Sequence, residues 1–126
     1  MTDVIKQAYE QGIITKATTE HDIQNNIRKL FSFCGFLTFR ANVGKVLMQN
    51  GRWFDTGLPK GFPDLFGYDN LNKPFFIEVK NAMGKPRPDQ IRFHKMLTER
   101  GICHGIARSP EEAIAIVKGD LIGYGY

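Results

Sequence analysis

In the first quarter of the chain, apolar residues recur at the 3.6-residue spacing of an amphipathic helix. Thr19 is a suitable cap for this helix, with Asp22 three residues later, and Gly35 is a suitable end. The apolar stripe between them consists of Ile23, Ile27, Leu30, Phe31 and Cys34. Proline and glycine punctuation predicts further helices over residues 2–11, 88–100 and 111–118.

Short segments that alternate apolar with polar residues, or are rich in β-branched and aromatic residues, predict strands. These segments cover residues 36–40, 45–49, 52–54, 64–68, 74–80 and 102–107. Asn50-Gly51, between the second and the third, is the strongest short-range signal for a hairpin. Together the helical and strand patterns predict the α/β class, with a central mixed β-sheet of four or five strands flanked by helices.

Length and composition fit one globular domain over residues 1–126. The chain is too short for two independent cores, and 42% hydrophobic with 24% charged residues excludes a mostly disordered chain. A net charge of +4 mildly favours a polyanionic partner. Cys34 and Cys103 form no CxxC pair, so we expect no disulfide framework. The sequence has no signal-peptide pattern and no apolar run of the ~20 residues that a membrane helix needs, so we expect a cytoplasmic protein without membrane contact.

The most informative chemistry lies in the predicted strand PFFIEVK. Side chains alternate between the faces of a strand, so Glu78 and Lys80 share the face opposite to the apolar one. Asp64 belongs to the preceding strand, and at neighbouring positions the carboxylates of Asp64 and Glu78 can converge on one cation. Hard divalent ions such as Mg²⁺ take oxygen ligands, acidify a bound water and offset charge on a phosphodiester. Lys80 can orient that water or neutralise charge that develops on the phosphate.

A Glu-x-Lys triplet alone is more often an exposed ion pair on a strand. Pro63-Asp64, thirteen intervening residues and then Glu78-Val79-Lys80 together resemble the PD-(D/E)xK nuclease superfamily. More narrowly, the chain looks like the small stand-alone VRR-Nuc domains of viral and bacterial replication and repair proteins, over about residues 19–118. The resemblance implies a restriction-endonuclease-like core, similar to Holliday-junction resolvases, with Mg²⁺ or Mn²⁺ as cofactor and no nucleotide cofactor.

The same resemblance adds residues to the predicted site. Glu20 lies within the apolar stripe of its helix, where the helix dipole explains a first-turn carboxylate equally well. The family carries a matching acid on its first helix, which implies that Glu20 faces the metal together with Asp64 and Glu78. The resemblance also implies that the Val79 carbonyl binds the metal and that Gln90, at the start of the next helix, positions or contacts the scissile phosphate.

Several basic residues are predicted to contact DNA. GLPKGFPDL resembles the family's glycine-rich approach to its metal-binding aspartate, and small residues there let backbone amides approach a phosphate. The DNA-binding candidates are Lys60 in this loop, and Arg40, Lys45, Lys85 and Arg87, with Arg52, Arg92 and Lys95 as further basic candidates. The loop at 81–88 is predicted to be mobile and to contact the substrate. No HExxH motif is present, and we expect His94 on the helix surface or at the edge of the substrate.

The predicted function is a Mg²⁺- or Mn²⁺-dependent DNA endonuclease that is selective for branched DNA such as four-way junctions. The predicted hairpin carries more apolar side chains than one face of a small sheet can bury, and together with the resemblance this favours a homodimer. The apolar residues of the hairpin are Val46, Leu47, Met48, Trp53 and Phe54. The resemblance to small stand-alone domains also suits a phage or bacterial replication module. The alternatives are a catalytically silent nucleic-acid-binding module, an end-dependent exonuclease or restriction-type enzyme, and a structural domain. Tyr124 and Tyr126 are predicted in a loose tail or against a partner.

Overall fold

The computed structural model describes residues 2–126, with side chains from Asp3 onward. Its helices are α1 (Thr2–Glu10), α2 (Glu20–Phe33), α3 (Pro88–Glu99) and α4 (Pro110–Lys118). Its strands are β1 (Leu37–Arg40), β2 (Lys45–Leu47), β3 (Trp53–Asp55), β4 (Leu65–Tyr68), β5 (Pro74–Val79), β6 (Cys103–Ala107) and β7 (Ile122–Tyr124). Every predicted helix and strand is present, and only β7 was not predicted. None of the described helices has the length and apolar character needed to cross a membrane.

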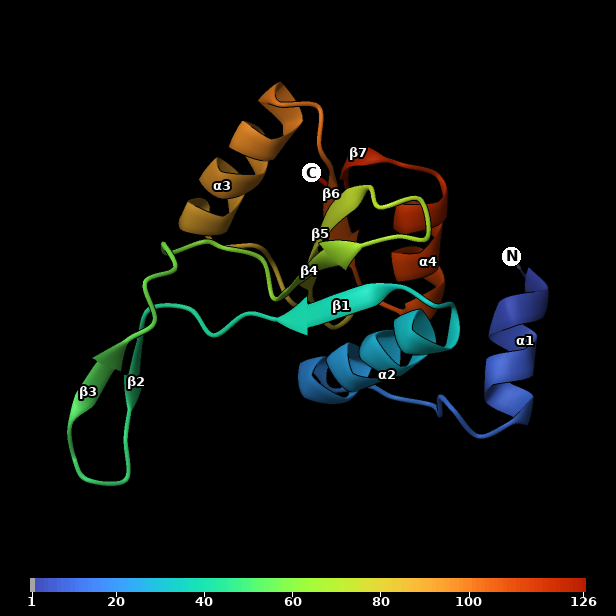
Figure 1. Cartoon of the computed structure of the whole chain (residues 1–126), viewed down its shortest axis with the longest axis horizontal. Helices are drawn as coiled ribbons and strands as arrows, with labels where there is room; N and C mark the ends of the chain where they lie inside the picture. Colours follow the sequence, from blue (N-terminus) through green and yellow to red (C-terminus); the bar gives the residue numbers. More distant parts are fainter. Residues whose placement is uncertain (1) are drawn as a thin grey trace.

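Five strands form the central sheet, in the order β1-β4-β5-β6-β7. β1, β4 and β5 are antiparallel neighbours, whereas β6 runs parallel to β5 and β7 runs parallel to β6. Parallel neighbours need a crossover connection, which α3 supplies between β5 and β6 and α4 supplies between β6 and β7. The sheet is therefore mixed and flanked by helices, which confirms the predicted fold class (Figure 1).

The main core lies between one face of the sheet and the helices α1, α2 and α4. Phe75, Ile77 and Val79 alternate along β5 and are at most 1% exposed on this face. They pack with the apolar stripe of α2 and with α4, and the rings of Phe31 and Phe75 meet edge to face at 5.2 Å. The predicted alternation of β5 is thus confirmed, because its apolar residues occupy the core and leave Glu78 on the opposite face.

An aromatic cluster under α3 covers part of the opposite face. The ring of Phe62, from the loop before β4, lies 5.2 Å from Phe93 of α3 and 5.9 Å from Phe76 of β5. Phe66 of β4 stacks on Phe76 at 6.2 Å. Phe62 thus links α3 to the rings of β4 and β5, while the helix itself packs mainly on β6 and β7. Glu78, the next residue of β5 on this face, comes to lie near the start of α3.

The ends of α2 follow the predicted signals. The Thr19 hydroxyl accepts a hydrogen bond from the Asp22 amide at 3.1 Å, as an N-cap does. At the other end Gly35 adopts φ +83°, the left-handed conformation that glycine permits. Glu20 is therefore the first residue of α2, and it is half-buried at the N-terminal end of the helix.

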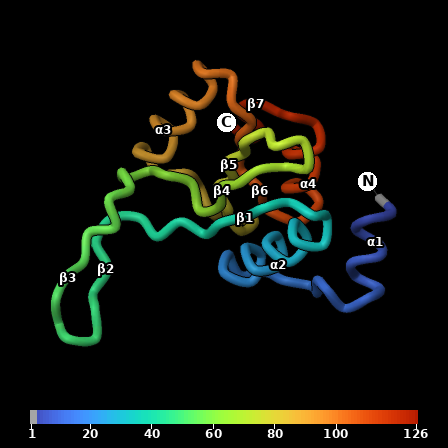
Figure 2. The backbone as a smooth tube through the Cα atoms, viewed as in Figure 1, coloured from blue at the N-terminus to red at the C-terminus, as the bar shows by residue number. Residues whose placement is uncertain are grey.

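The hairpin of β2 and β3 is a separate two-stranded sheet that extends away from the rest of the domain (Figure 2). Leu47 pairs with Trp53 across the two strands, next to the Asn50-Gly51 turn. Packing of this hairpin on α2 would have been a simple explanation of its apolar side chains. Instead, Leu47 is 57% exposed and Trp53 is 66% exposed.

The C-terminal segment differs from the prediction of a loose tail. Tyr124 ends β7, and its hydroxyl donates a hydrogen bond to Glu112 Oε2 of α4 at 2.8 Å. The ring of Tyr126 stacks on the buried ring of His94 at 4.3 Å. The prediction was wrong because β7 has only three residues, and Gly123 at its centre adopts φ +80° and carries no strand signal.

Candidate active site

Strand pairing places the two central carboxylates side by side. Leu65 of β4 pairs with Ile77 of β5 in an antiparallel register, so Asp64 comes to lie opposite Glu78. Asp64 Oδ2 also accepts a hydrogen bond from the Val79 amide at 2.8 Å, which fixes the carboxyl group against β5. The sheet register therefore brings together two acids that are separated by thirteen residues in the chain.

Burial raises the pKa of both carboxyl groups, and Glu78 adds to the rise at Asp64. Burial, followed by a hydrogen bond from its own carboxyl group to Glu78 and repulsion from that carboxylate, raises the pKa of Asp64 to about 7. Burial also raises the pKa of Glu78, although the hydrogen bond with Asp64 and the charges of Lys80 and Arg87 act against the rise. Both shifts disfavour two negative charges side by side, and a bound cation would compensate that charge.

Gln90 holds Glu78 in place from α3. Its Nε2 donates a hydrogen bond to Glu78 Oε1 at 3.1 Å, and its Oε1 accepts one from the Arg87 amide at 2.9 Å. Gln90 is 4% exposed, so both ends of its amide are engaged inside the protein. Gln90 therefore holds the Glu78 carboxylate in the free protein, a contact that the sequence prediction for Gln90 did not name.

Lys80 and Glu20 are the other two charged residues predicted for this site. Lys80 follows β5 on the face of Glu78 and is only 6% exposed, and its amide donates to the Ala107 carbonyl of β6 at 3.2 Å. The charge of Glu20 reaches Glu78 and contributes to its raised pKa. Over the described residues, however, no three His, Cys, Asp or Glu side chains converge closely enough to form a metal cluster.

The donor set suits a hard divalent cation, because it consists of carboxylate oxygens. Glu78 Oε2 is buried and makes no hydrogen bond to any described residue, so one carboxylate oxygen is available to a ligand. Asp64 adds a second carboxylate beside it. Mg²⁺ commonly uses one or two carboxylates and completes its shell with water and substrate oxygens. The residues therefore fit the implied metal, with Glu20 and the Val79 carbonyl as predicted additions.

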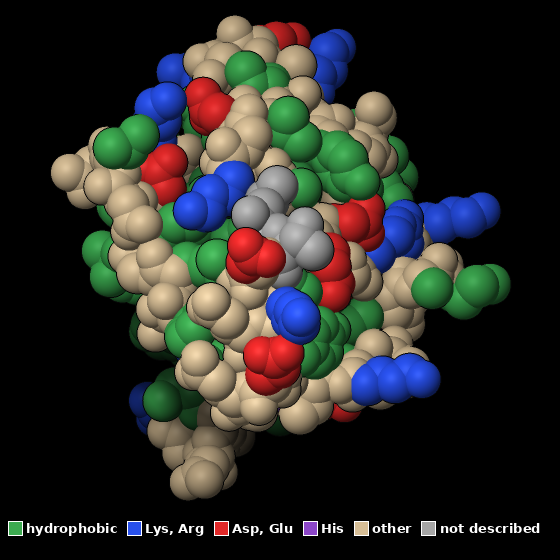
Figure 3. All heavy atoms as spheres, turned by 90° about the vertical axis from the view of Figure 1, so that its right-hand side faces the viewer, with side chains coloured by type: hydrophobic (Ala, Val, Ile, Leu, Met, Phe, Trp, Pro, Cys, Tyr) green, Lys and Arg blue, Asp and Glu red, His purple; other side chains and the backbone are tan. Residues whose placement is uncertain are grey.

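A groove with basic walls begins where α3 starts. It has a volume of about 720 Å³, and its basic lining residues are Lys45, Lys60, Arg87 and Arg92. The first three are predicted DNA contacts and Arg92 is a further basic candidate, while Arg40 and Lys85 are exposed but do not line this groove. On the side of the molecule that carries α1, acidic and basic side chains are interspersed instead (Figure 3). Positive charge is thus gathered beside the carboxylate site.

Gly61 lets the loop before β4 reach α3. It adopts φ +85°, and a Cβ atom there would lie 2.2 Å from the Asp89 carbonyl oxygen. Gly57, in the same loop, adopts φ +82° with open space around it. The sequence prediction for this loop was close approach of its backbone to a phosphate. The structure supplies another reason for glycine, which is the contact of Gly61 with the backbone of α3.

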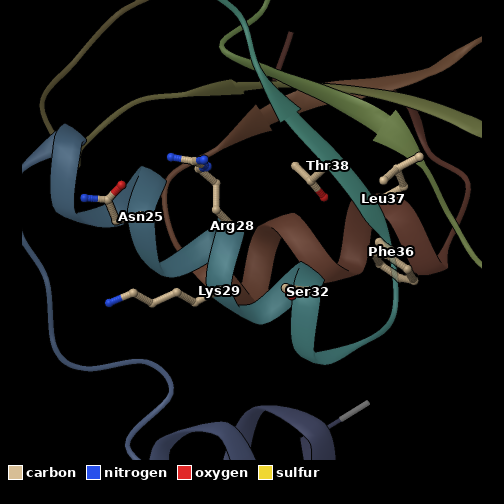
Figure 4. Close-up of a pocket in the computed structure, with 7 residues that line it drawn as sticks. All are labelled: Asn25, Arg28, Lys29, Ser32, Phe36, Leu37 and Thr38. Atoms are coloured by element: carbon tan, nitrogen blue, oxygen red, sulfur yellow. The ribbon is translucent and has the colours of Figure 1, made fainter.

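A second groove, of about 510 Å³, separates α2 from β1 (Figure 4). Arg28 of α2 and Thr38 of β1 extend into it, and Lys29 lies at its rim. Thr38 Oγ1 is buried without a hydrogen-bond partner in residues 2–126. Arg28 and Lys29 were not among the predicted DNA contacts. Two adjacent basic residues on the polar face of the helix were the sequence signal for a basic surface at this position.

The loop at 81–88 is anchored at its start. The Arg108 guanidinium donates to the carbonyls of Asn81 and Gly84, each at 2.6 Å. Asn81 Oδ1 in turn accepts a hydrogen bond from the Gly84 amide at 2.7 Å. These hydrogen bonds attach the start of the loop to Arg108, and the predicted mobility of the loop stays a prediction. Arg108 was missed because it lies 24 residues beyond Gly84 in the sequence.

His94 is the main residue that the sequence reasoning placed incorrectly. It is 1% exposed rather than on the helix surface, and its Nε2 lies 3.8 Å from Glu78 Oε2. Its Nδ1 is 2.6 Å from Nδ1 of His104 in β6. Burial lowers the pKa of each histidine to about 4. The signal was its position four residues after Gln90, on the same face of α3.

Comparison with known structures was decisive for the fold. A solved "VRR_NUC domain" superposes with a TM-score of 0.60 at 25% sequence identity, covering 81% of this chain and 97% of that domain. This chain resembles a VRR_NUC domain. The VRR_NUC resemblance inferred from the sequence motifs is thus confirmed, and it supports a nuclease-type fold. No family model matches the sequence, and no curated protein sequence matches it either.

Proposed function

We propose that this protein is a divalent-metal-dependent DNA nuclease that hydrolyses phosphodiester bonds at the site of Asp64, Glu78 and Lys80. One observation carries the proposal: the buried Glu78 carboxylate and the partly buried Asp64 carboxylate lie opposite each other in the strand register, with the buried Lys80 two residues after Glu78 and a basic groove at the start of α3. The VRR_NUC-like fold supports the same class of activity.

Each residue has a role that its contacts support. Asp64 and Glu78 hold the ion, and Gln90 keeps Glu78 aimed at it through the hydrogen bond to Oε1. When bound, Mg²⁺ or Mn²⁺ supplies an acidified water and compensates charge on the phosphate. Lys80 orients the attacking water or neutralises charge on the phosphate. Glu20 adds negative charge from α2, directly or through water, and the Val79 carbonyl completes the shell.

The DNA backbone would enter along the basic groove. Lys45, Lys60 and Arg87 line it from three separate segments, so they can contact successive phosphates. We expect binding to weaken steeply with salt, because each phosphate contact releases condensed counterion. Replacing Lys60 with alanine should lower the salt dependence by about one counterion, whereas Lys6→Ala, on α1 outside the groove, should not.

We further propose a homodimer that acts on branched DNA, with four-way junctions as the preferred substrate. The hairpin exposes a cluster of large apolar side chains, and exposed apolar patches commonly mark interfaces. A twofold dimer supplies two active sites for the two cuts that a junction requires. Light scattering at micromolar concentration tests the dimer. The double variant Leu47→Ser/Trp53→Ser should be monomeric, while Leu71→Ser, which changes an exposed leucine elsewhere, should not alter the mass.

The direct experiment is cleavage of linear duplex, single-stranded, flap and four-way-junction DNA of one sequence, with Mg²⁺ or Mn²⁺. Asp64→Asn and Glu78→Gln should each lower the rate by about 10²–10³ while DNA binding persists. Undiminished cleavage in EDTA would refute metal dependence. Lys80→Ala with wild-type turnover would remove Lys80 from the mechanism, and equal rates on linear duplex and junctions would refute the substrate preference.

A catalytically silent nucleic-acid-binding module is the second candidate. It is favoured by one observation, the convergence of only two carboxylates within the described part of the chain. A silent module would bind DNA through the same groove and show no metal-dependent cleavage of any substrate above. Cleavage only from free ends would instead identify an exonuclease.

A further inference from the structure

A chain of buried polar groups continues from the carboxylate site into the protein beneath α3. It runs from Glu78 to His94, then to His104 and to Thr98. His94 and His104 are at most 1% exposed, and the ring of Tyr126 stacks on His94. His94, His104 and Thr98 have no role in the function proposed above.

The hydrogen-bond contacts of this series of polar groups indicate which ring nitrogens carry a proton. The Thr98 hydroxyl donates to the His94 carbonyl at 3.1 Å, so its oxygen accepts from His104 Nε2 at 2.7 Å. His104 Nδ1 is then an acceptor, and it receives the proton of His94 Nδ1 at 2.6 Å. This is the assignment of neutral rings that satisfies all three contacts. It leaves a lone pair on His94 Nε2.

That lone pair is directed at a second acceptor. His94 Nε2 and Glu78 Oε2 lie 3.8 Å apart, and both are buried without a hydrogen-bond partner among residues 2–126. Two acceptors cannot satisfy each other, and leaving such atoms unpaired inside a protein costs free energy. A metal ion satisfies both, since bonds of about 2.0–2.2 Å from imidazole nitrogen and carboxylate oxygen span this separation.

We propose that His94 Nε2 is a nitrogen ligand of the divalent cation, which it shares with Glu78 Oε2. This inference rests on the proposed metal site and deepens it. Asp64, opposite Glu78 in the strand register, joins the shell when the cation draws the carboxylates together, and water or DNA oxygens complete it. His104 and Thr98 act as positioning residues that hold the imidazole in the tautomer that can ligate, as outer hydrogen bonds do for metal-bound histidines.

A nitrogen ligand changes which ion the site prefers. Imidazole suits first-row transition ions better than Mg²⁺, for which oxygen ligands are preferred. The protein should therefore bind Mn²⁺ more tightly than Mg²⁺. The ratio of the two affinities should fall when the nitrogen is removed, and this distinguishes a ligand from a residue that only supports the fold.

The test uses Mn²⁺ as the probe in the absence of DNA. Pulsed EPR of the wild-type protein with bound Mn²⁺ should detect a directly coordinated nitrogen. In His94→Gln this coupling should disappear, and Mn²⁺ affinity measured by calorimetry should fall at least about tenfold, with a smaller change for Mg²⁺. His21→Gln, which replaces an exposed histidine of α2, should leave both unchanged.

The wild-type spectrum decides the question even if His94→Gln fails to fold. Bound Mn²⁺ without nitrogen coupling, but with affinity that depends on Asp64 and Glu78, overturns the role of His94 and leaves the proposed nuclease site intact. Absence of Mn²⁺ binding by the wild-type protein overturns both. Equal losses of Mn²⁺ and Mg²⁺ affinity in a folded His94→Gln variant also overturn the inference, because they indicate a purely structural role.

Discussion

Replacing Asp64 with asparagine should stabilise the metal-free protein, and should do so only above the pH at which Asp64 begins to ionise. In the folded protein the carboxyl group accepts from the Val79 amide, and burial together with Glu78 raises its pKa. Asparagine has the same shape, accepts the same amide hydrogen bond, and donates to Glu78 without ever becoming charged. It therefore mimics the protonated form of Asp64 at every pH.

The direction follows from the pKa. Because the pKa of Asp64 is raised in the folded state, its contribution to stability is fully present below the pKa of an unfolded aspartate, about 3.9, and is lost as the pH rises through about 7. The rise from 3.8 to about 7 is worth at most about 4 kcal/mol. Since Asp64 is partly exposed, we expect about half of that, on the order of 2 kcal/mol.

The assay is thermal unfolding in metal-free buffer between pH 5 and pH 8. The melting temperature of Asp64→Asn should exceed that of the wild type by several degrees at pH 8, about 4–8 °C for this size of protein, and the difference should shrink toward pH 5. Glu99→Gln, an exposed carboxylate at the end of α3, should show no such pH-dependent difference. A difference between Asp64→Asn and wild type that is constant with pH would refute the coupled carboxylate pair.

Three further outcomes are expected. Gly61→Ala should lower the free energy of unfolding by at least about 2 kcal/mol, whereas Gly57→Ala should cost only about 1 kcal/mol; a comparison of their unfolding curves separates the clash with α3 from the cost of positive φ alone. Arg108→Ala should release the start of the 81–88 loop, giving faster amide exchange there, and unchanged exchange would contradict the anchor. Trp53→Ser should alter stability by no more than about 0.5 kcal/mol at low protein concentration, and a larger loss would show that the hairpin packs on its own domain.

The sequence determined the elements and the catalytic candidates, because those depend on local patterns. The alternation in PFFIEVK specified which face of β5 enters the core, since a strand turns successive side chains to opposite sides. Thr19 and Gly35 specified the ends of α2, since capping is a property of a few neighbouring residues. The spacing of Asp64 from Glu78-Val79-Lys80 was enough to indicate the fold that the comparison then confirmed.

Only the tertiary structure decided how the site is surrounded. The burial of His94 depends on α3 docking over β5 and β6, and its contact with His104 joins residues on separate elements. β7 forms because the edge of β6 offers it hydrogen bonds, which overcomes the weak strand propensity around Gly123. The exposure of the hairpin was equally undetermined, because the same apolar pattern would fit a strand pair folded against α2. Local spacing specifies which residues share a face, whereas the packing of that face depends on elements distant in the chain.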